Sequence, residues 1–247
     1  MQQELEDWKT HGVEGHFQAK NAWMPYHEFF SAKLAKVVGA QENEVVVMNT
    51  LTANLHFMMV SFYRPTNKRN KIIIEGTAFP SDKYAVTSQI RFHGYDPEEC
   101  LIQLRPRTGE ETLRTEDIEA VLREHADSVA LLMLGGVNYY TGQFFDLEYL
   151  ASVAHDIGAV VGYDLAHAVG NVELKLHHWN VDFAVWCHYK YLNSGPGAIA
   201  GAFVHQKHLT NPDIPRFEGW WGTDKKSRFL MKDNFESMPS AESWQLS

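Results

Sequence analysis

Short apolar runs alternate with amphipathic segments along most of this 247-residue chain, and this alternation constrains the fold more than any other feature. The apolar runs are predicted β-strands at residues 44–49, 71–76, 128–134, 159–164, 181–187 and 198–205. Segments with helical spacing of apolar residues lie at 51–63, 115–126 and 146–158, and we expect Thr115 and Asp146 to cap the last two. Continuously apolar strands separated by helices predict an α/β fold, in which a mostly parallel sheet is covered on both faces.

Charge and composition exclude several classes of function. The net charge of -9 argues against a nucleic-acid surface, because a phosphate backbone requires clustered Lys and Arg side chains. No basic amphipathic run indicates a membrane surface, and no apolar stretch approaches the length of a membrane span. Two cysteines make no disulfide framework, and the polar N-terminus has no secretory signal. We therefore expect an enzyme of the cytoplasm.

Polar residues with chemical potential follow two of the predicted strands. Asp164 ends the strand 159–164 and is followed by His167, while Lys190 lies just beyond the strand 181–187. Taken singly, each has an ordinary explanation: Asp164 as a turn cap, His167 as a polar loop residue, Lys190 as a surface charge. Ligands of open α/β sheets bind beyond the carboxyl ends of the strands, so a shared site is the functional alternative.

Two further segments fit the same edge of the sheet. Leu51 and Thr52 open a predicted helix, where free backbone N–H groups and a hydroxyl suit an anion, although a threonine at a helix start is often only a cap. Phe79 follows the strand 71–76 and is either a core residue or a face for stacking on a ring; Ser81 and Asp82 begin a helix or contact a ligand. A lysine, an acid and a phosphate-binding helix start together predict a pyridoxal phosphate site, where the acid pairs with the pyridine nitrogen.

At this point the sequence resembles a known family, the kynureninases. The resemblance covers nearly the whole chain and is densest in the segments 78–82, 110–118, 139–143, 162–193, 195–205 and 219–222. It implies the large domain of a fold-type I pyridoxal phosphate enzyme, a three-layer sandwich. It also implies hydrolysis of the Cβ–Cγ bond of L-kynurenine or 3-hydroxykynurenine, giving anthranilate or 3-hydroxyanthranilate and L-alanine, in tryptophan degradation and NAD biosynthesis.

The resemblance assigns roles to individual residues. Lys190 matches the lysine that carries the cofactor, Asp164 the partner of the pyridine nitrogen, and His167 a residue beside the ring. Tyr189 matches a tyrosine on the cofactor phosphate that also relays protons. The other matching positions are cofactor contacts at Leu51, Thr52, Phe79, Pro80, Ser81, Asp82, Gly135 and Trp220, and a substrate contact at His16.

Two departures from the family pattern bear on activity. Gly135 stands where some members have a small hydroxyl residue. We interpret residues 1–247 as the cofactor-binding large domain, because the family continues beyond this point into a small C-terminal domain and begins with a further N-terminal segment. The arginine that binds the substrate's α-carboxylate lies in that later part, with Arg216 and Arg228 the nearest candidates here. We therefore expect cofactor binding but very poor turnover from these residues alone, and a homodimer as the assembly.

Other interpretations stay open from the sequence. A cysteine desulfurase relative would share the Asp, His and Lys pattern but needs a catalytic cysteine on a loop, which neither Cys100 nor Cys187 resembles. A non-catalytic core that binds cofactor or a partner subunit is another alternative. The 13 histidines show no metal-ligand spacing, and the pair at 177–178 is expected to be a solvated turn, so no metal is predicted.

Overall fold

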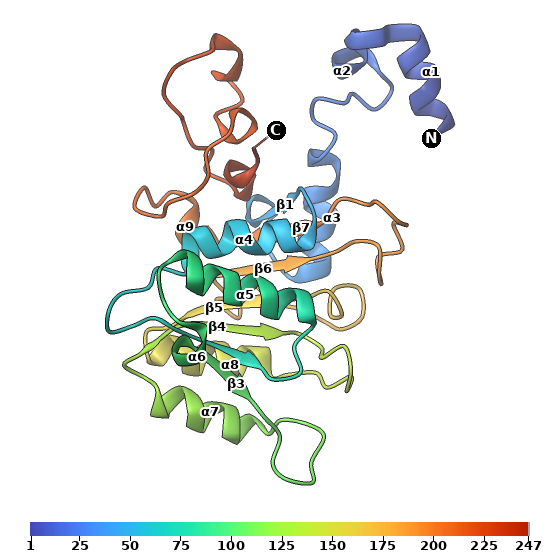
Figure 1. Cartoon of the computed structure of the whole chain (residues 1–247). Helices are drawn as coiled ribbons and strands as arrows, with labels where there is room; N and C mark the ends of the chain where they lie inside the picture. Colours follow the sequence, from blue (N-terminus) through green and yellow to red (C-terminus); the bar gives the residue numbers. More distant parts are fainter. Residues whose placement is uncertain (247) are drawn as a thin grey trace.

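A computed structural model describes residues 1–246, and its centre is a seven-stranded sheet of order β1-β7-β6-β5-β4-β2-β3 (Figure 1). All neighbouring strands pair in parallel except those on either side of β7, which is antiparallel to both β6 and β1. The prediction of a mostly parallel sheet is therefore confirmed. The strands are β1 Val45–Val47, β2 Lys71–Glu75, β3 Leu101–Leu104, β4 Val129–Gly135, β5 Val160–Asp164, β6 Phe183–Trp186 and β7 Gly201–Val204.

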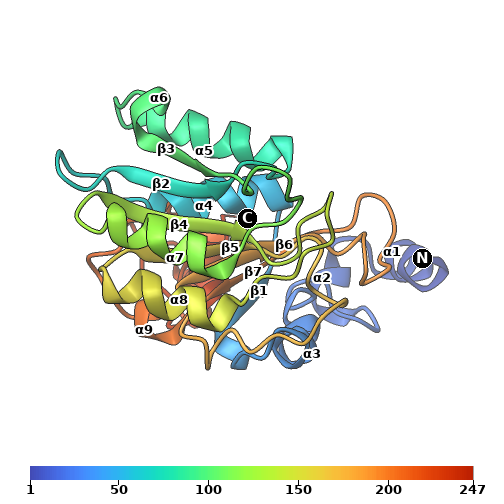
Figure 2. The ribbon, with the colours of Figure 1, turned by 90° about the horizontal axis from the view of Figure 1, so that it is seen from below.

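Helices cover both faces of this sheet and make the predicted three layers (Figure 2). One face is covered by α3, α7 and α8, and the other by α4 and α5 together with the C-terminal 3-10 turn η5. The α-helices are α1 Gln2–His11, α2 Gly15–Gln18, α3 Glu28–Val38, α4 Leu51–Phe62, α5 Pro80–Phe92, α6 Pro97–Cys100, α7 Thr115–Glu124, α8 Leu147–Asp156 and α9 Gln206–Leu209. The 3-10 turns are η1 Gly12–Glu14, η2 Glu42–Glu44, η3 Trp220–Gly222, η4 Arg228–Leu230 and η5 Ala241–Trp244.

Strand β2 shows how the two-layered core arises from the sequence. Successive side chains of a strand point to opposite faces, so Ile73 enters the core beneath α7 and α8, while Ile72 and Ile74 enter the core beneath α4 and α5. All three are essentially inaccessible to solvent, and each such side chain contributes about 1.5–3 kcal/mol. Because the strand is buried on both faces, apolar residues follow one another along its centre, which is why these strands read as continuous apolar runs.

The helix starts follow the predictions in one case and depart from them in another. Asp146 caps α8, since its carboxylate accepts the backbone N–H of Tyr149 at 3.1 Å. The prediction for Thr115 was wrong: the N-cap of α7 is Arg114, which makes no side-chain cap bond, and Thr115 is the first helical residue. Predicted strands and helices are otherwise one to three residues longer than those observed at one or both ends, because the residues at their edges lie outside the regular hydrogen-bonding of the ladder or helix.

The N-terminal helices α1 and α2 lie away from the sheet in both views (Figures 1 and 2). Trp8 and Phe17 on this arm are both more than half exposed. Within residues 1–246, none of the helices combines the length and apolar character needed to cross a membrane.

Candidate active site

A cavity of about 170 Å³ opens at the carboxyl edge of the sheet, beyond β2, β4, β5 and β6. These strands end in Glu75, Gly135, Asp164 and Trp186, and the first three of these residues line the cavity. Most of the predicted site residues come together here. Those that line the cavity are Leu51, Thr52, Phe79, Ser81, Asp82, Gly135, Asp164, His167, Tyr189 and Lys190.

Lys190 reaches into this cavity from the loop after β6. Its amine nitrogen lies 2.8 Å from Nε2 of His167 and 5.7 Å from the centre of the Phe79 ring. Burial, and next the charge of Lys190, lower the pKa of His167, so the imidazole is neutral near pH 7. A neutral imidazole can accept the lysine proton through Nε2 while its Nδ1–H faces the hydroxyl of Tyr191 at 3.4 Å. The hydrogen bond to His167 therefore fixes the position of the Lys190 amine in the cavity.

Three carboxyl groups surround the single lysine of the cavity. Burial raises the pKa of Asp164, although the Ala166 N–H, which donates to Oδ1 at 2.8 Å, and the Lys190 charge act in the opposite direction. Burial, followed by the charge of Asp164, raises the pKa of Asp82 well above the usual carboxyl range. Burial likewise raises the pKa of Glu75 to about 7. Three carboxyl groups share one ammonium group at low dielectric, so they either keep a proton or are stabilised by a further cationic group.

The part of the cavity lined by the start of α4 is suited to an anion. Helix α4 begins at Leu51, and its N-cap Thr50 makes no side-chain cap bond to the first turn. The hydroxyls of Thr52 and Ser81 lie 2.9 Å apart, and either can donate to the other. The positive end of a twelve-residue helix with two hydroxyls beside it is a favourable position for a phosphate group.

Phe79 and Tyr139 form an aromatic wall of the cavity. Their rings lie 5.3 Å apart and are nearly perpendicular, at 89°. Phe79 is 47% exposed, which argues against the alternative of an ordinary core phenylalanine. Such a wall provides a flat surface against which a planar ring can pack.

Three predicted contacts do not line this cavity. Pro80 is the first residue of α5 and places Ser81 and Asp82 in the first turn. His16 lies in α2, where its ring packs edge-on against Trp23 and its Nδ1 is 2.8 Å from the carbonyl oxygen of Val13.

Trp220 lies in η3, packs against Phe229 and donates its indole N–H to the carbonyl of Arg228. The structure therefore does not bring His16 and Trp220 to Lys190.

The two arginines considered for the substrate's carboxylate are also engaged elsewhere. Arg216 donates to the hydroxyls of Ser237 and Ser243 and lies over the ring of Trp244. Arg228 is buried and donates to the carbonyls of Trp221 and Thr223. Neither guanidinium lines the cavity that contains Lys190.

The sequence reasoning missed four residues that line the cavity: Glu75, Val137, Tyr139 and Ala166. Glu75 had a detectable signal, because it is an acid that ends an otherwise apolar strand, as Asp164 does. Tyr139 and Val137 come from the loop after β4, whose path depends on hydrogen bonds that no periodic pattern predicts.

The two cysteines do not provide a reactive thiolate. Cys100 ends α6 and Cys187 follows β6; both are buried. Burial raises the pKa of both thiols, which suppresses the thiolate form needed for attack. This arrangement does not favour the cysteine desulfurase alternative.

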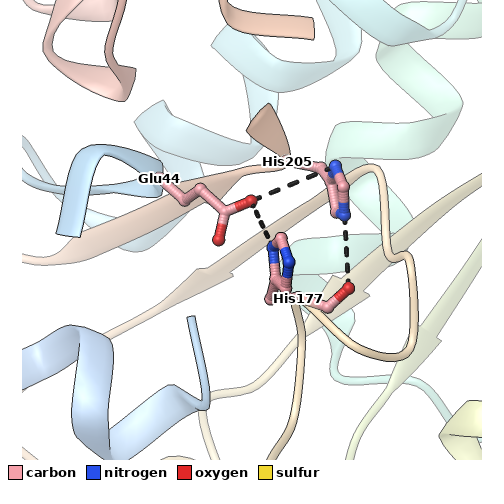
Figure 3. Close-up of side chains that lie close together, drawn as sticks. All are labelled: Glu44, His177 and His205. Carbon is pink, nitrogen blue, oxygen red and sulfur yellow. Dashed lines mark hydrogen bonds and ion pairs between the residues drawn. The ribbon is translucent and has the colours of Figure 1, made fainter. Parts of the chain in front are cut away.

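A second polar cluster, formed by Glu44, His177 and His205, lies next to the start of β1 and the end of β7 (Figure 3). None of these three residues lines the cavity that contains Lys190. The expectation of a solvated turn at residues 177–178 was wrong for His177, which is half-buried and lies 2.9 Å from the fully buried carboxylate of Glu44. Both carboxylate oxygens already accept hydrogen bonds, Oε1 from His177 and the N–H of Gln206, and Oε2 from the N–H of Gln41.

The histidines of this cluster are similarly satisfied. The rings of His177 and His205 are stacked 5.0 Å apart, and Nδ1 of His205 accepts the N–H of Lys207 at 3.2 Å. The other ring nitrogen of His205 faces the carbonyl oxygen of His177. The lone pairs that a metal ion would need are thus used within the protein, and we interpret the cluster as a buried capping network.

The residues of the cavity fit pyridoxal phosphate by charge and by chemistry. Asp82 Oδ1 is buried without a hydrogen-bond partner in the part of the chain that the structure describes. A protonated ring nitrogen would supply the missing positive charge beside Asp164, and Lys190 provides the amine. Thr52 and Ser81 would hold the phosphate, so each functional part of the cofactor has a chemically suitable counterpart.

Comparison with known proteins identifies the family of the chain. The aminotransferase class-V family profile matches residues 1–215. Kynureninase from Myxococcus xanthus is 59% identical to the chain over 247 residues, and that from Koribacter versatilis is 57% identical over the same length. Kynureninase from Nematostella vectensis is 56% identical over 243 residues. The matches cover 98–100% of this chain but only 52–58% of these relatives, so the chain spans little more than half of their length.

Solved structures share the fold at much lower identity. A cysteine desulfurase from Thermococcus onnurineus superposes with a TM-score of 0.73 at 18% identity, covering all of this chain and 60% of that one. The cystine C-S lyase C-DES superposes with a TM-score of 0.72 at 16% identity, covering 100% of this chain and 64% of the other. On the family match over residues 1–215, the chain belongs to the aminotransferase class-V family.

Proposed function

We propose that this chain holds pyridoxal phosphate on Lys190 and forms the cofactor-binding part of an enzyme that hydrolyses L-kynurenine or 3-hydroxykynurenine. The observation that carries the proposal is the convergence of Lys190, His167 and Asp164 at one edge of the sheet. The naming of its relatives, at 52–59% identity, supports the substrate class. A homodimer and a cytoplasmic location belong to the same proposal.

The cofactor would supply an electron sink for the substrate's Cα. Asp164 would hold a proton on the ring nitrogen, because an ionised carboxylate beside a cation favours both charges. His167 holds the Lys190 amine at 2.8 Å and is neutral, so it accepts a hydrogen bond without adding positive charge. Burial raises the pKa of Tyr189, so its phenol keeps its proton and can donate it.

The substrate's α-carboxylate has no evident clamp among the described residues, since Arg216 and Arg228 are bonded elsewhere. Positioning contributes roughly 7–11 kcal/mol in well-oriented reactions, so the lack of a clamp is costly. We infer that residues 1–247 bind cofactor but turn over kynurenine poorly without the part that the longer relatives have in addition.

A larger cavity of about 630 Å³ beside the Lys190 loop supports the same view. It lies between α3 and the segment 188–199 and is largely lined by apolar side chains, including Trp23, Tyr26 and Phe30. An apolar hollow of this size favours burial against further protein.

An anthranilate fluorescence assay with kynurenine tests the function. We would compare this chain with the same chain joined to the part of the Myxococcus xanthus relative that it does not span. The proposal predicts anthranilate production by the longer protein and little by the shorter. No anthranilate from either, with cofactor bound, would favour the non-catalytic alternative. Equal rates would show that an arginine within residues 1–247 binds the carboxylate.

A further inference from the structure

Glu75 is a buried acid that lines the cavity, and among the described residues no hydrogen bond or ion pair joins it to Lys190. It ends β2 and is only 3% exposed. Its Oε2 accepts the backbone N–H of Gly135 at 3.0 Å, and its Oε1 accepts the side-chain amide of Asn138 at 3.3 Å. Burial raises the pKa of Glu75, while these two hydrogen bonds act in the opposite direction. The carboxyl group therefore connects the end of β2 to the end of β4 and the loop beyond it.

Asn138 extends this connection into both loops that border the cavity. Its amide nitrogen also donates to the hydroxyl of Thr77 at 3.0 Å and to the Thr77 carbonyl at 3.3 Å. Its amide oxygen accepts the backbone N–H groups of Tyr140 and Thr141, each at 3.0 Å. Asn138 is itself 3% exposed. One buried side chain thus closes the loop after β4 and binds it to the loop after β2.

The two loops carry the aromatic wall. Phe79 stands two residues after Thr77, and Tyr139 is the neighbour of Asn138. Their perpendicular contact at 5.3 Å depends on both loops being held at a fixed separation. The Lys190 amine lies 5.7 Å from the Phe79 ring, so a movement of the wall changes the surroundings of the reacting nitrogen.

We propose that Glu75 and Asn138 are positioning residues, which fix the Phe79–Tyr139 wall at the distance from Lys190 that the bound cofactor ring requires. That the ring is the one of pyridoxal phosphate rests on the proposed function. The coupling of the two loops by Glu75 and Asn138 does not depend on that function. Asn138 does not line the cavity, and the role that we assign to both residues is to set the geometry of the aromatic wall that packs on the ring.

A pair of complementary substitutions separates this role from general stability. In Glu75→Gln, the new NH2 group faces either the N–H of Gly135 or the amide NH2 of Asn138, so one donor opposes another in either orientation. In Asn138→Asp, the new carboxylate faces the carboxylate of Glu75. In the double variant E75Q/N138D the new amide donates to the new carboxylate, and the Gly135 N–H keeps its acceptor. The net charge of the parent is also restored, whereas the hydrogen bond that Asn138 donates to the Thr77 carbonyl is not, so the double variant should recover most but not all of what each single variant loses.

The readouts are the affinity for pyridoxal phosphate and the visible circular dichroism of the bound cofactor. Each single variant is expected to bind about tenfold more weakly or worse, with reduced dichroism, and the double variant to recover most of both. Gln143→Ala is the matched control, because Gln143 anchors the same loop to Leu113, on the side away from the cavity. This control should lower the melting temperature and leave the dichroism unchanged.

Failure of this proposal is distinguishable from failure of the proposed function. Single variants within twofold of the parent, or an affinity that follows the melting temperature in all variants including Gln143→Ala, would overturn the positioning role. A parent that binds no cofactor would overturn the proposed function instead. In that case, fluorotyrosine NMR of the cofactor-free chain tests whether Glu75 and Asn138 couple the two loops. The Tyr139 signal is assigned by its loss in Tyr139→Phe.

That signal should move in each single variant and return in E75Q/N138D; an unmoved signal would refute the coupling. Should the single variants not fold, Thr77→Val removes one hydrogen bond of Asn138 at an exposed residue without burying a charge. It should move the Tyr139 signal in the same direction by a smaller amount, and an unmoved signal would again refute the coupling.

Discussion

The amine of Lys190 and Nε2 of His167 lie 2.8 Å apart, although 23 residues separate them in the sequence. They meet because β5 and β6 are parallel neighbours, so the loops that leave their carboxyl ends emerge at the same edge of the sheet. Burial keeps the imidazole neutral, which makes it an acceptor for the lysine proton.

Replacing His167 with Phe should slow attachment of pyridoxal phosphate to Lys190. Without Nε2 the amine is no longer held in one position, and misplacement of a reacting atom by about 1 Å costs up to about 100-fold in rate, so we expect attachment to slow about tenfold or more. The measurement is stopped-flow absorbance after mixing with cofactor. Tyr191→Phe is the control, because it removes only the 3.4 Å contact to Nδ1. Attachment at the parental rate in His167→Phe would contradict this role.

Asp164→Asn should keep the cofactor bound while turnover in the longer enzyme falls by about 100-fold or more. The physical reason is that a neutral amide does not stabilise a proton on the ring nitrogen as a buried carboxylate does. Anthranilate fluorescence measures the turnover, and Asp127→Asn on the exposed surface serves as the control. Near-parental turnover in Asp164→Asn would show that the acid has another function.

Asp82 should make the cofactor-free chain less stable as pH rises. Its pKa in the folded chain is raised by burial, whereas the unfolded carboxyl group ionises near pH 4. Unfolding therefore releases a proton above about pH 4, and the free energy of unfolding falls as pH rises toward the folded pKa. Asp82→Asn removes this loss.

Urea unfolding at pH 5 and pH 8 measures the effect. The gain from Asp82→Asn, relative to the parent, should be larger at pH 8 than at pH 5. An equal gain at both values, or a larger gain at pH 5, would show that the carboxyl group is not destabilised by burial.

Glu44→Gln should destabilise the fold by about 2 kcal/mol, because a neutral amide cannot accept all the hydrogen bonds that the buried carboxylate accepts. His178→Ala, at the exposed neighbour of His177, should have little effect. Chemical unfolding measures both. If the cluster is a capping network, zinc or a chelator leaves the parent's melting temperature unchanged; a rise with zinc would show a metal site.

How far the sequence predicts this molecule depends on the kind of interaction. The strand cores and the meeting of Asp164, His167 and Lys190 follow from apolar periodicity and from the rule that parallel strands align their carboxyl ends. The antiparallel direction of β7 does not follow from its apolar pattern, which is the same for either direction. Asn138 was missed for a related reason: its importance lies in hydrogen bonds to loops distant in sequence.

The placement of His16 and Trp220 shows a second limit. Both were assigned by resemblance, and both lie outside the cavity in the single chain. The resemblance identified both by sequence position alone, which does not determine where a side chain packs, whereas the positions of Lys190 and Asp164 follow from the sheet itself.

The central claim, that Lys190 binds pyridoxal phosphate covalently, is tested most directly by borohydride reduction followed by peptide mapping. The purified chain, incubated with cofactor, should show a visible band that disappears on reduction, with the reduced cofactor attached to Lys190. Lys190→Ala should have neither the band nor the label. Attachment to a different lysine, or a visible band that persists in Lys190→Ala, would contradict the account.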